Sequence, residues 1–380
     1  MLRKPLAFCV LISVVAIASV EISATSIESN PNKKKGAGAP FQIRRGKKWG
    51  YMDKTGKVII EPQFEAASDF FHGLAAVFKD QKWGYINEKG EEVIPFSFDG
   101  ALDFTGEIAP VRVGRKWGYI DLSGRWIVSP QFQAASEVTE GLARVLYWNR
   151  IQCSSGIFTN QNAPLYVYVM PTITTALTSG CFPMNQKYGF IDMSGKFVVQ
   201  PNLTRAEDFS EGLATFTVEN RGGFRVGYID ATGNKIIAPE FEHVESFSEG
   251  LAAAMFNGKY GFIDKSGKWV IEPKFDVVGT FSEGLARVMV DAKTGYINRN
   301  GEMVIAPQFN EGWDFSEGLA PVHEAGQWRY IDQSGKTVLR LGRARWGFSD
   351  GLTVVGDSPN RVYMNKQGEV VAPYEVGSQF

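Results

Sequence analysis

The sequence predicts an all-β protein made of tandem three-stranded antiparallel meanders, arranged either as a propeller-like ring or as an open β superhelix. The first observation is a phrase, Trp-Gly-Tyr-Ile-Asp-x-Ser/Thr-Gly-Lys, which recurs nine times with variations and is followed by a Val/Ile run and a proline. Counted between equivalent glycine positions, successive copies are 34, 34, 71, 38, 34, 34, 34 and 33 residues apart. A period of this length is typical of stacked supersecondary units. The second observation is that no stretch combines a sustained helical hydrophobic period with helix caps, so long helices are not expected.

One copy shows why each unit should be a meander. Residues 251–256 are short and apolar, which predicts a first strand, and Asn257-Gly258 is a strong hairpin signal because both residues tolerate positive φ. Residues 259–264 predict the second strand, and 265–267 form a turn whose glycine suits a left-handed conformation. Residues 268–272 are rich in β-branched and aromatic side chains, which favours a third strand. The proline that follows lacks an N–H and ends it.

The copies fill residues 41–380 as one array rather than as several domains, because an isolated small meander is only marginally stable. Nine blades would be many for a closed ring, so the sequence leaves the ring and the superhelix open. Whole meanders occupy roughly 40–62, 74–95, 108–130, 142–201, 213–239, 251–273, 285–307, 319–340 and 352–373.

The aromatic residue and the glycine that define the repeat are expected to be structural. A glycine lets a ring or a backbone approach closely, so burial of the ring against the next unit is the expected role. A ladder of rings that faces a ligand is the alternative, and Val226, Thr294 and Arg361 in the same slot weaken it. The repeat-defining residues are Trp49, Gly50, Trp83, Gly84, Trp117, Gly118, Tyr188, Gly189, Tyr260, Gly261 and Trp328.

The N-terminus predicts export. Residues 1–24 read as a signal peptide, with a basic start, an apolar core at 6–15 and two candidate cleavage sites, at Ala18 and Ala24. An uncleaved membrane anchor is the alternative, but the apolar stretch is shorter than a span requires. Residues 25–40 are polar and predict a flexible linker. We therefore expect a secreted, periplasmic or cell-surface protein with no transmembrane span after cleavage.

Charge and motifs argue against several function classes. The net charge is −1 with both signs interspersed, which argues against nucleic acid as a partner. The three histidines, His72, His243 and His323, form no metal-binding motif, and no nucleophile or phosphate-loop motif occurs. We therefore expect no catalytic residue, no cofactor and no metal. The recurring Asp, three residues before a turn glycine, predicts a turn former, and the recurring Glu of Glu-Gly-Leu-Ala is not a unique catalyst; a pair of such Glu in a glycosidase is the remote alternative.

The fourth unit contains a long insertion, at about 148–184, in the hairpin turn that Asn257-Gly258 occupies in the sixth unit. Cys153 and Cys181 both lie in it, and an even pair in an exported protein predicts a disulfide, with two free thiols as the alternative. Insertions on repeat proteins often form the binding face, although a tolerated ornament is equally compatible with the sequence. The candidate contact residues of this loop are Trp148, Tyr166, Tyr168 and Met170.

At these motifs the chain resembles the WG-repeat family, also called KWG or Leptospira repeats. Lys-Trp-Gly is present at 48–50, 82–84 and 116–118, and the resemblance covers about residues 41–380. The copies depart from the pattern in the fourth unit and in the last two, which lose the Trp-Gly pair. The resemblance implies an all-β repeat protein, often secreted or associated with a bacterial envelope, without catalytic residues.

Taken together, these features predict an exported non-enzymatic scaffold that binds another protein at the cell envelope or outside the cell. A cell-wall or glycan-binding module that uses exposed aromatic side chains is the alternative, and a glycosidase-like enzyme is the remote one.

Overall fold

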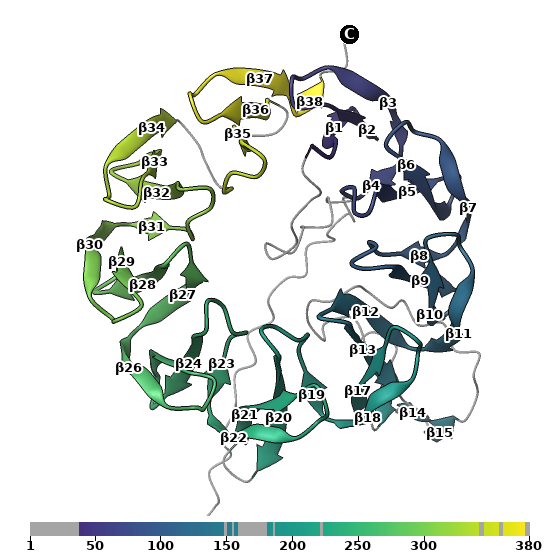
Figure 1. Ribbon diagram of the computed structural model, residues 1–380, viewed down its shortest axis with the longest axis horizontal. Helices are drawn as coiled ribbons and strands as arrows, with labels where there is room; N and C mark the ends of the chain where they lie inside the picture. Colours follow the sequence, from purple (N-terminus) through teal and green to yellow (C-terminus); the bar gives the residue numbers. More distant parts are fainter. Residues whose placement is uncertain are drawn as a thin grey trace, which may run out of the picture.

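The computed structural model describes residues 38–147, 150–153, 156–158, 181–184, 187–220, 223–341, 346–356 and 360–376. Nine small antiparallel sheets follow one another around a closed ring, as Figure 1 shows, and no helix occurs among the described residues. The all-β prediction is therefore confirmed. Of the two predicted arrangements, the protein adopts the propeller.

Each blade contains the predicted meander and, in most blades, one further short strand. In the second blade, β4 (Ala66–Ala67) pairs with β5 (Leu74–Lys79), which pairs with β6 (Lys82–Asn87), which pairs with β7 (Glu92–Phe98). The short strand β4 comes from the segment that the sequence reading treats as a connection. It forms there because the backbone N–H of Glu65 and of Ser68 donate to the carbonyls of Phe78 and Ala76.

The other strands are as follows. Blade 1 contains β1 (Phe41–Arg45), β2 (Lys48–Met52) and β3 (Val58–Phe64); blade 3 contains β8 (Gly100–Ala101), β9 (Ile108–Val113), β10 (Lys116–Asp121) and β11 (Trp126–Phe132); blade 4 contains β12 (Ala134–Thr139), β13 (Leu142–Tyr147), β17 (Lys187–Asp192) and β18 (Phe197–Leu203). Blade 5 contains β19 (Arg205–Ala206), β20 (Leu213–Asn220), β21 (Gly223–Asp230) and β22 (Lys235–Phe241); blade 6 contains β23 (His243–Val244), β24 (Ala252–Phe256), β25 (Lys259–Ile263) and β26 (Trp269–Phe275). Blade 7 contains β27 (Val277–Ser282), β28 (Leu285–Val290), β29 (Lys293–Asn298) and β30 (Met303–Phe309); blade 8 contains β31 (Glu311–Gly312), β32 (Ala320–Glu324), β33 (Gln327–Ile331) and β34 (Thr337–Leu341); blade 9 contains β35 (Leu352–Val355), β36 (Val362–Asn365) and β37 (Val370–Pro373).

The two ends of the array meet in blade 1. The C-terminal strand β38 (Glu375–Val376) pairs with β1 in parallel, with Arg44 opposite Glu375. The hydroxyl of Tyr363 in blade 9 donates to the carbonyl of Gln42 in blade 1 at 2.8 Å, across 321 residues of sequence. Figure 1 shows β37 and β38 beside β1 at this junction. The N-terminal blade is thereby completed by the C-terminal end of the chain.

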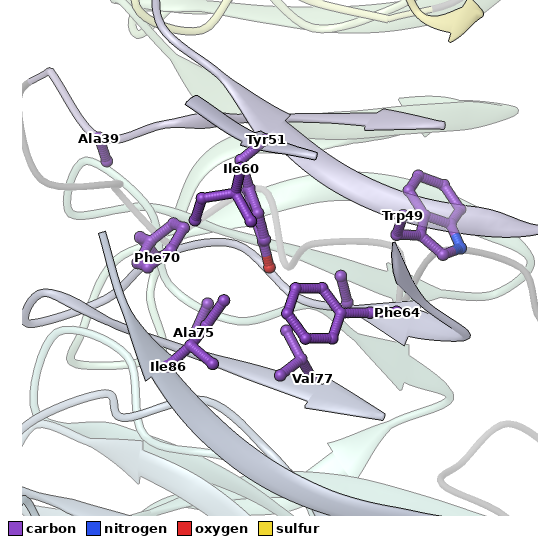
Figure 2. Close-up of a cluster of buried hydrophobic side chains, with 10 residues drawn as sticks. Ala39, Trp49, Tyr51, Ile60, Phe64, Phe70, Ala75, Val77 and Ile86 are labelled. Atoms are coloured by element: carbon purple, nitrogen blue, oxygen red, sulfur yellow. The ribbon is translucent and has the colours of Figure 1, made fainter. Parts of the chain in front are cut away.

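The hydrophobic core lies between neighbouring blades. Figure 2 shows one such cluster, in which Trp49, Tyr51, Ile60 and Phe64 of blade 1 face residues of blade 2, among them Phe70, Ala75, Val77 and Ile86. A large aromatic side chain that buries roughly 150–250 Å² contributes on the order of 4–6 kcal/mol to the free energy of folding, before the entropy of ordering is subtracted. No blade can bury this surface alone, so the blades stabilise one another.

The glycine of the Trp-Gly pair is required by a β-bulge. The strand pairing shifts register between Trp83 and Tyr85, which brings the outer strand β7 very close to Gly84. A Cβ atom on Gly84 would lie 2.8 Å from the carbonyl oxygen of Ile94. Only glycine fits this approach.

Candidate binding surface

Polar atoms of the repeat motif connect most blades to the next one. Lys82 donates to Asp99 at 2.6 Å, and the hydroxyl of Tyr85 donates to the carbonyl of Leu102 at 2.7 Å, in both cases 17 residues ahead. The same tyrosine bond, at 2.6–2.9 Å, recurs as Tyr51–Ser68, Tyr119–Ser136, Tyr228–Glu245, Tyr296–Trp313 and Tyr330–Trp346. These tyrosines are fully buried, and burial raises the pKa of their hydroxyls, in Tyr330 to about 12. The motif residues thus hold neighbouring blades together.

The tryptophan slot is mainly a packing position. Trp49 and Trp117 are buried, and the guanidinium groups of Arg44 and Arg112 lie over their rings. The slot is half-buried where it holds Trp83, Tyr188, Val226, Tyr260, Trp328 or Arg361. A buried threonine, Thr294, fills it in blade 7. Because the slot packs equally with aliphatic and polar side chains, these rings do not form a continuous exposed ladder.

The recurring aspartate forms a turn. The Oδ1 atom of Asp53 accepts hydrogen bonds from the backbone N–H of Thr55 and Lys57 and from the Thr55 hydroxyl, at 2.9, 3.1 and 2.6 Å. The bond from the Thr55 side chain contributes most to lowering the pKa of Asp53. Asn87 makes the same two backbone contacts in blade 2 without a charge. The carboxylate is therefore replaceable, which fits a turn former and not an acid–base group.

The recurring glutamate links successive turns. Both carboxylate oxygens of Glu140 in blade 4 accept from the backbone N–H of Glu211 and Gly212 in blade 5, at 2.5 and 2.8 Å. The same contact recurs in the following blades, where a glycine N–H donates to the glutamate carboxylate of the preceding blade. The pairs are Gly250 with Glu211, Gly284 with Glu249, Gly318 with Glu283 and Gly351 with Glu317. These turns lie toward the centre of the ring (Figure 1). These carboxylates therefore form the hydrogen bonds that join the turns of blades 4 to 9.

The histidines are separate from one another. His72 occupies the glutamate position of its turn with φ of 51°, His243 lies 3.3 Å from the hydroxyl of Tyr260, and His323 stacks beside Trp328. In the part of the chain that the structure describes, no group of three or more His, Cys, Asp or Glu side chains could hold a metal ion. In the same part, no helix is long and apolar enough to cross a membrane.

The insertion leaves blade 4 where the hairpin of β13 and β17 would otherwise turn. Tyr147 and Lys187 face each other at the end of this hairpin, as Phe256 and Lys259 do around the two-residue turn of blade 6. Beyond that pair, β14 (Arg150–Cys153), β15 (Gly156–Phe158) and β16 (Cys181–Met184) form a separate sheet in the order β15-β14-β16, beside blade 4 in Figure 1.

The backbone register of this small sheet places Cys153 directly opposite Cys181. Cross-strand partners in an antiparallel pair have Cα atoms about 4.5–5.5 Å apart, within the range of a disulfide. Trp148, Tyr166, Tyr168 and Met170 lie outside the described residues, as do the predicted signal peptide at 1–24 and most of the predicted linker at 25–40.

Two exposed tryptophans of the described residues were not predicted from the sequence as candidate binding residues. Trp313 in blade 8 and Trp346 in blade 9 are 48% and 42% exposed. Both come two residues before the buried phenylalanine of the Phe-Ser-Glu/Asp-Gly-Leu phrase. A comparison of this position across the repeats could have found them, because no other blade has an aromatic residue there.

The comparisons with known proteins concern the repeat and the fold. The sequence model of the family described as WG containing repeat matches residues 49–83, 83–117, 117–147, 188–221, 227–260, 260–293 and 295–328. No curated protein matches the sequence.

The solved structures to which the chain is similar include Hsv2p of Kluyveromyces lactis, which is 11% identical with a TM-score of 0.34 over 49% of this chain and 70% of that one. PorZ, a surface component of the type-IX secretion system of Porphyromonas gingivalis, is 11% identical with a TM-score of 0.26 over 91% and 53%. The acylaminoacyl peptidase of Pyrococcus horikoshii is 10% identical with a TM-score of 0.36 over 86% and 57%. The chain spans little more than half the length of the last two. At these values the similarities do not indicate a shared activity.

Proposed function

Because this chain belongs to the family of WG containing repeat proteins, we propose that it is an exported, non-enzymatic scaffold that binds another protein at the cell envelope or outside the cell, with the insertion of blade 4 as a contact element. The residues that recur in most units support this proposal. The lysine, tyrosine, aspartate and glutamate of the repeat bond to neighbouring blades or to their own turns. What recurs therefore builds a rigid ring, and specific contacts must come from what does not recur.

The observation that carries the proposal is the place of the insertion. It replaces a two-residue hairpin turn with 39 residues, 148–186, between Tyr147 and Lys187, and the two flanking strands stay in the register of the other blades. A loop on a rigid scaffold can vary without disturbing the fold, and binding residues are often found on such loops. The proposed disulfide between Cys153 and Cys181 would close the base of this loop and restrict its freedom before binding.

The test is a variant in which 148–186 are replaced by Asn-Gly, the turn of blade 6. Because Tyr147 and Lys187 already face each other as Phe256 and Lys259 do, the ring should keep its circular dichroism spectrum and its unfolding midpoint. Full-length protein and variant are compared in pull-downs from envelope extract, and a captured protein is identified and then bound directly as purified material.

Loss of direct binding in the variant supports the proposal. Equal binding by both forms would rule out the insertion as the contact element. A chain that captures no protein but binds on a glycan array would favour the glycan-binding alternative.

A further inference from the structure

Blades 8 and 9 carry two tryptophans that the fold does not require. Trp313 and Trp346 occupy the same position in adjacent blades, and both indole side chains are about half exposed. The equivalent residues in blades 2 to 7 are Ser68, Leu102, Ser136, Glu207, Glu245 and Gly279. A position that accepts serine, glutamate and glycine needs no large ring for folding. A large exposed side chain that packing does not require is a candidate for an interaction site.

Both tryptophans are held on a fixed backbone. The carbonyl of Trp313 accepts from the hydroxyl of Tyr296 at 2.8 Å. The carbonyl of Trp346 accepts from Tyr330 at 2.6 Å and from the Thr353 hydroxyl at 3.1 Å. Each indole is therefore mounted at a boundary between blades and has only two side-chain torsions left to order on binding. Rigid aromatic side chains of this kind give a large contact area at a small entropic cost.

An arginine lies over each of these rings. The guanidinium of Arg287 is 6.0 Å from the Trp313 ring centre, and that of Arg361 is 5.3 Å from the Trp346 ring centre. Arg287 is paired with Asp314, with 3.5 Å between Nε and Oδ1. Arg361 differs in that it forms no ion pair with a carboxylate among the described residues, although its buried Nε, like that of Arg287, has no hydrogen-bond partner there. The site at blade 9 therefore combines an exposed indole with a guanidinium that pairs with no carboxylate of the described residues.

We propose that Trp346 and Arg361, with Trp313 on the neighbouring blade, form a contact site for a protein segment in which an apolar or aromatic side chain stands next to Asp or Glu. The apolar side chain packs against the Trp346 indole, the carboxylate pairs with Arg361, and Trp313 contacts a further part of the segment. Tryptophan and arginine are the residue types that most often dominate protein interfaces, and a charged group gains most where it is partly desolvated. The positive charge of Arg361 beside the Trp346 ring favours an acidic partner over a neutral sugar. This inference rests on the proposed scaffold function but not on the insertion.

The test uses the full chain and a library of short peptides in which two adjacent central positions are varied over all amino acids. Selected peptides are measured by fluorescence anisotropy against Trp346→Ser, Trp313→Ser and Arg361→Gln. Serine is the residue of blades 2 and 4 at this position, so the two tryptophan variants should fold. Trp126→Ser is the matched control, because Trp126 is similarly exposed but lies on the outer strand of blade 3.

We expect selection of peptides that pair an acidic with an apolar residue, and binding at least about tenfold weaker in Trp346→Ser and Arg361→Gln. Replacing the peptide's Asp or Glu by its amide should remove most of the effect of Arg361→Gln, because the two changes delete the same pair. The control should bind normally.

Selection of basic or uncharged peptides, equal binding by Trp346→Ser, or binding to glycans in place of peptides would overturn the inference. The inference would also be overturned if the full chain and the Trp346→Ser variant selected the same peptides from the library. These outcomes are separable from those of the insertion test. Insertion-dependent capture with an inert Trp346 would leave the scaffold function standing and remove only this site.

Discussion

Tyr363→Phe tests whether the ring is closed. The phenol of Tyr363 is buried, and its hydroxyl reaches the carbonyl of Gln42 at 2.8 Å, so the bond joins the last blade to the first. Tyr85→Phe removes another bond between neighbouring blades, from Tyr85 to Leu102 at 2.7 Å. Both substitutions delete a phenol oxygen from a buried tyrosine, although the acceptor Gln42 lies on β1 and the acceptor Leu102 lies between β8 and β9. Of the two bonds, only that of Tyr363 depends on closure.

The expected cost follows from what each deletion leaves behind. The phenylalanine ring fills the same space, so no cavity is formed, but a buried carbonyl loses its donor. Leaving a buried hydrogen-bonding group unsatisfied costs about 1–3 kcal/mol, and we expect the lower half of this range because buried carbonyls tolerate a missing partner better than buried N–H groups do. In a closed ring both variants should lose similar stability. In an open array Tyr363 would lie at a free end, and its hydroxyl would exchange the bond for water at almost no cost.

The measurement is guanidinium chloride unfolding of both variants, followed by circular dichroism and by tryptophan fluorescence to check that the two probes coincide. Equal losses support closure. A Tyr363→Phe protein as stable as the unmodified chain, beside a destabilised Tyr85→Phe protein, would refute it.

Three further predictions concern stability and covalent structure. Gly195→Ala should destabilise the protein by about 1–3 kcal/mol, because a Cβ there would collide with Val128 of the preceding blade. Gly212 has nearly the same positive φ but open space around it, so Gly212→Ala should cost less. Equal losses of stability in thermal unfolding would contradict the steric argument. Stability should fall as pH rises above about 10, by about 1.4 kcal/mol per pH unit for each buried tyrosine. The reason is that the unfolded chain releases the phenol proton there, while burial holds the pKa of Tyr330 at about 12 in the folded protein. Tyrosinate absorbance that titrates near pH 10 in the folded protein would argue against this. Protein exported to an oxidising compartment should resist thiol alkylation at Cys153 and Cys181 under denaturing conditions until a reductant is added, and labelling without reductant would exclude the disulfide.

The strands and turns could be predicted because their causes are local. Asn257-Gly258 selects a hairpin turn through backbone conformation alone, and Asp264 folds back onto the N–H groups of its own turn at Ser266 and Lys268. At Gly84 the sequence indicated only that another group approaches the glycine closely, and it did not indicate a bulge. The reason is that the oxygen that a Cβ would meet belongs to another strand. The short first strand β4 was missed for the same reason, since two residues carry too little pattern and pair only when β5 is in place.

The candidate site was less accessible to sequence reasoning. The insertion is visible as a break in the period, and the register that sets Cys153 opposite Cys181 agrees with the predicted pairing without demonstrating the bond. Trp313 and Trp346 look like ordinary core residues in the sequence, because 44% of this chain is hydrophobic and exposure is not encoded in residue type.

By itself, the sequence determined that this protein is a tandem array of β-meanders with one interrupted unit, because period, turn chemistry and strand composition each depend on a few neighbouring residues. Only the tertiary structure decided that the array closes into nine blades. Closure depends on the small rotation between successive blades and on whether Tyr363 and β38 meet β1 after the whole chain has been laid down. That sum of small angles is a property of packing between units, and no single repeat contains it.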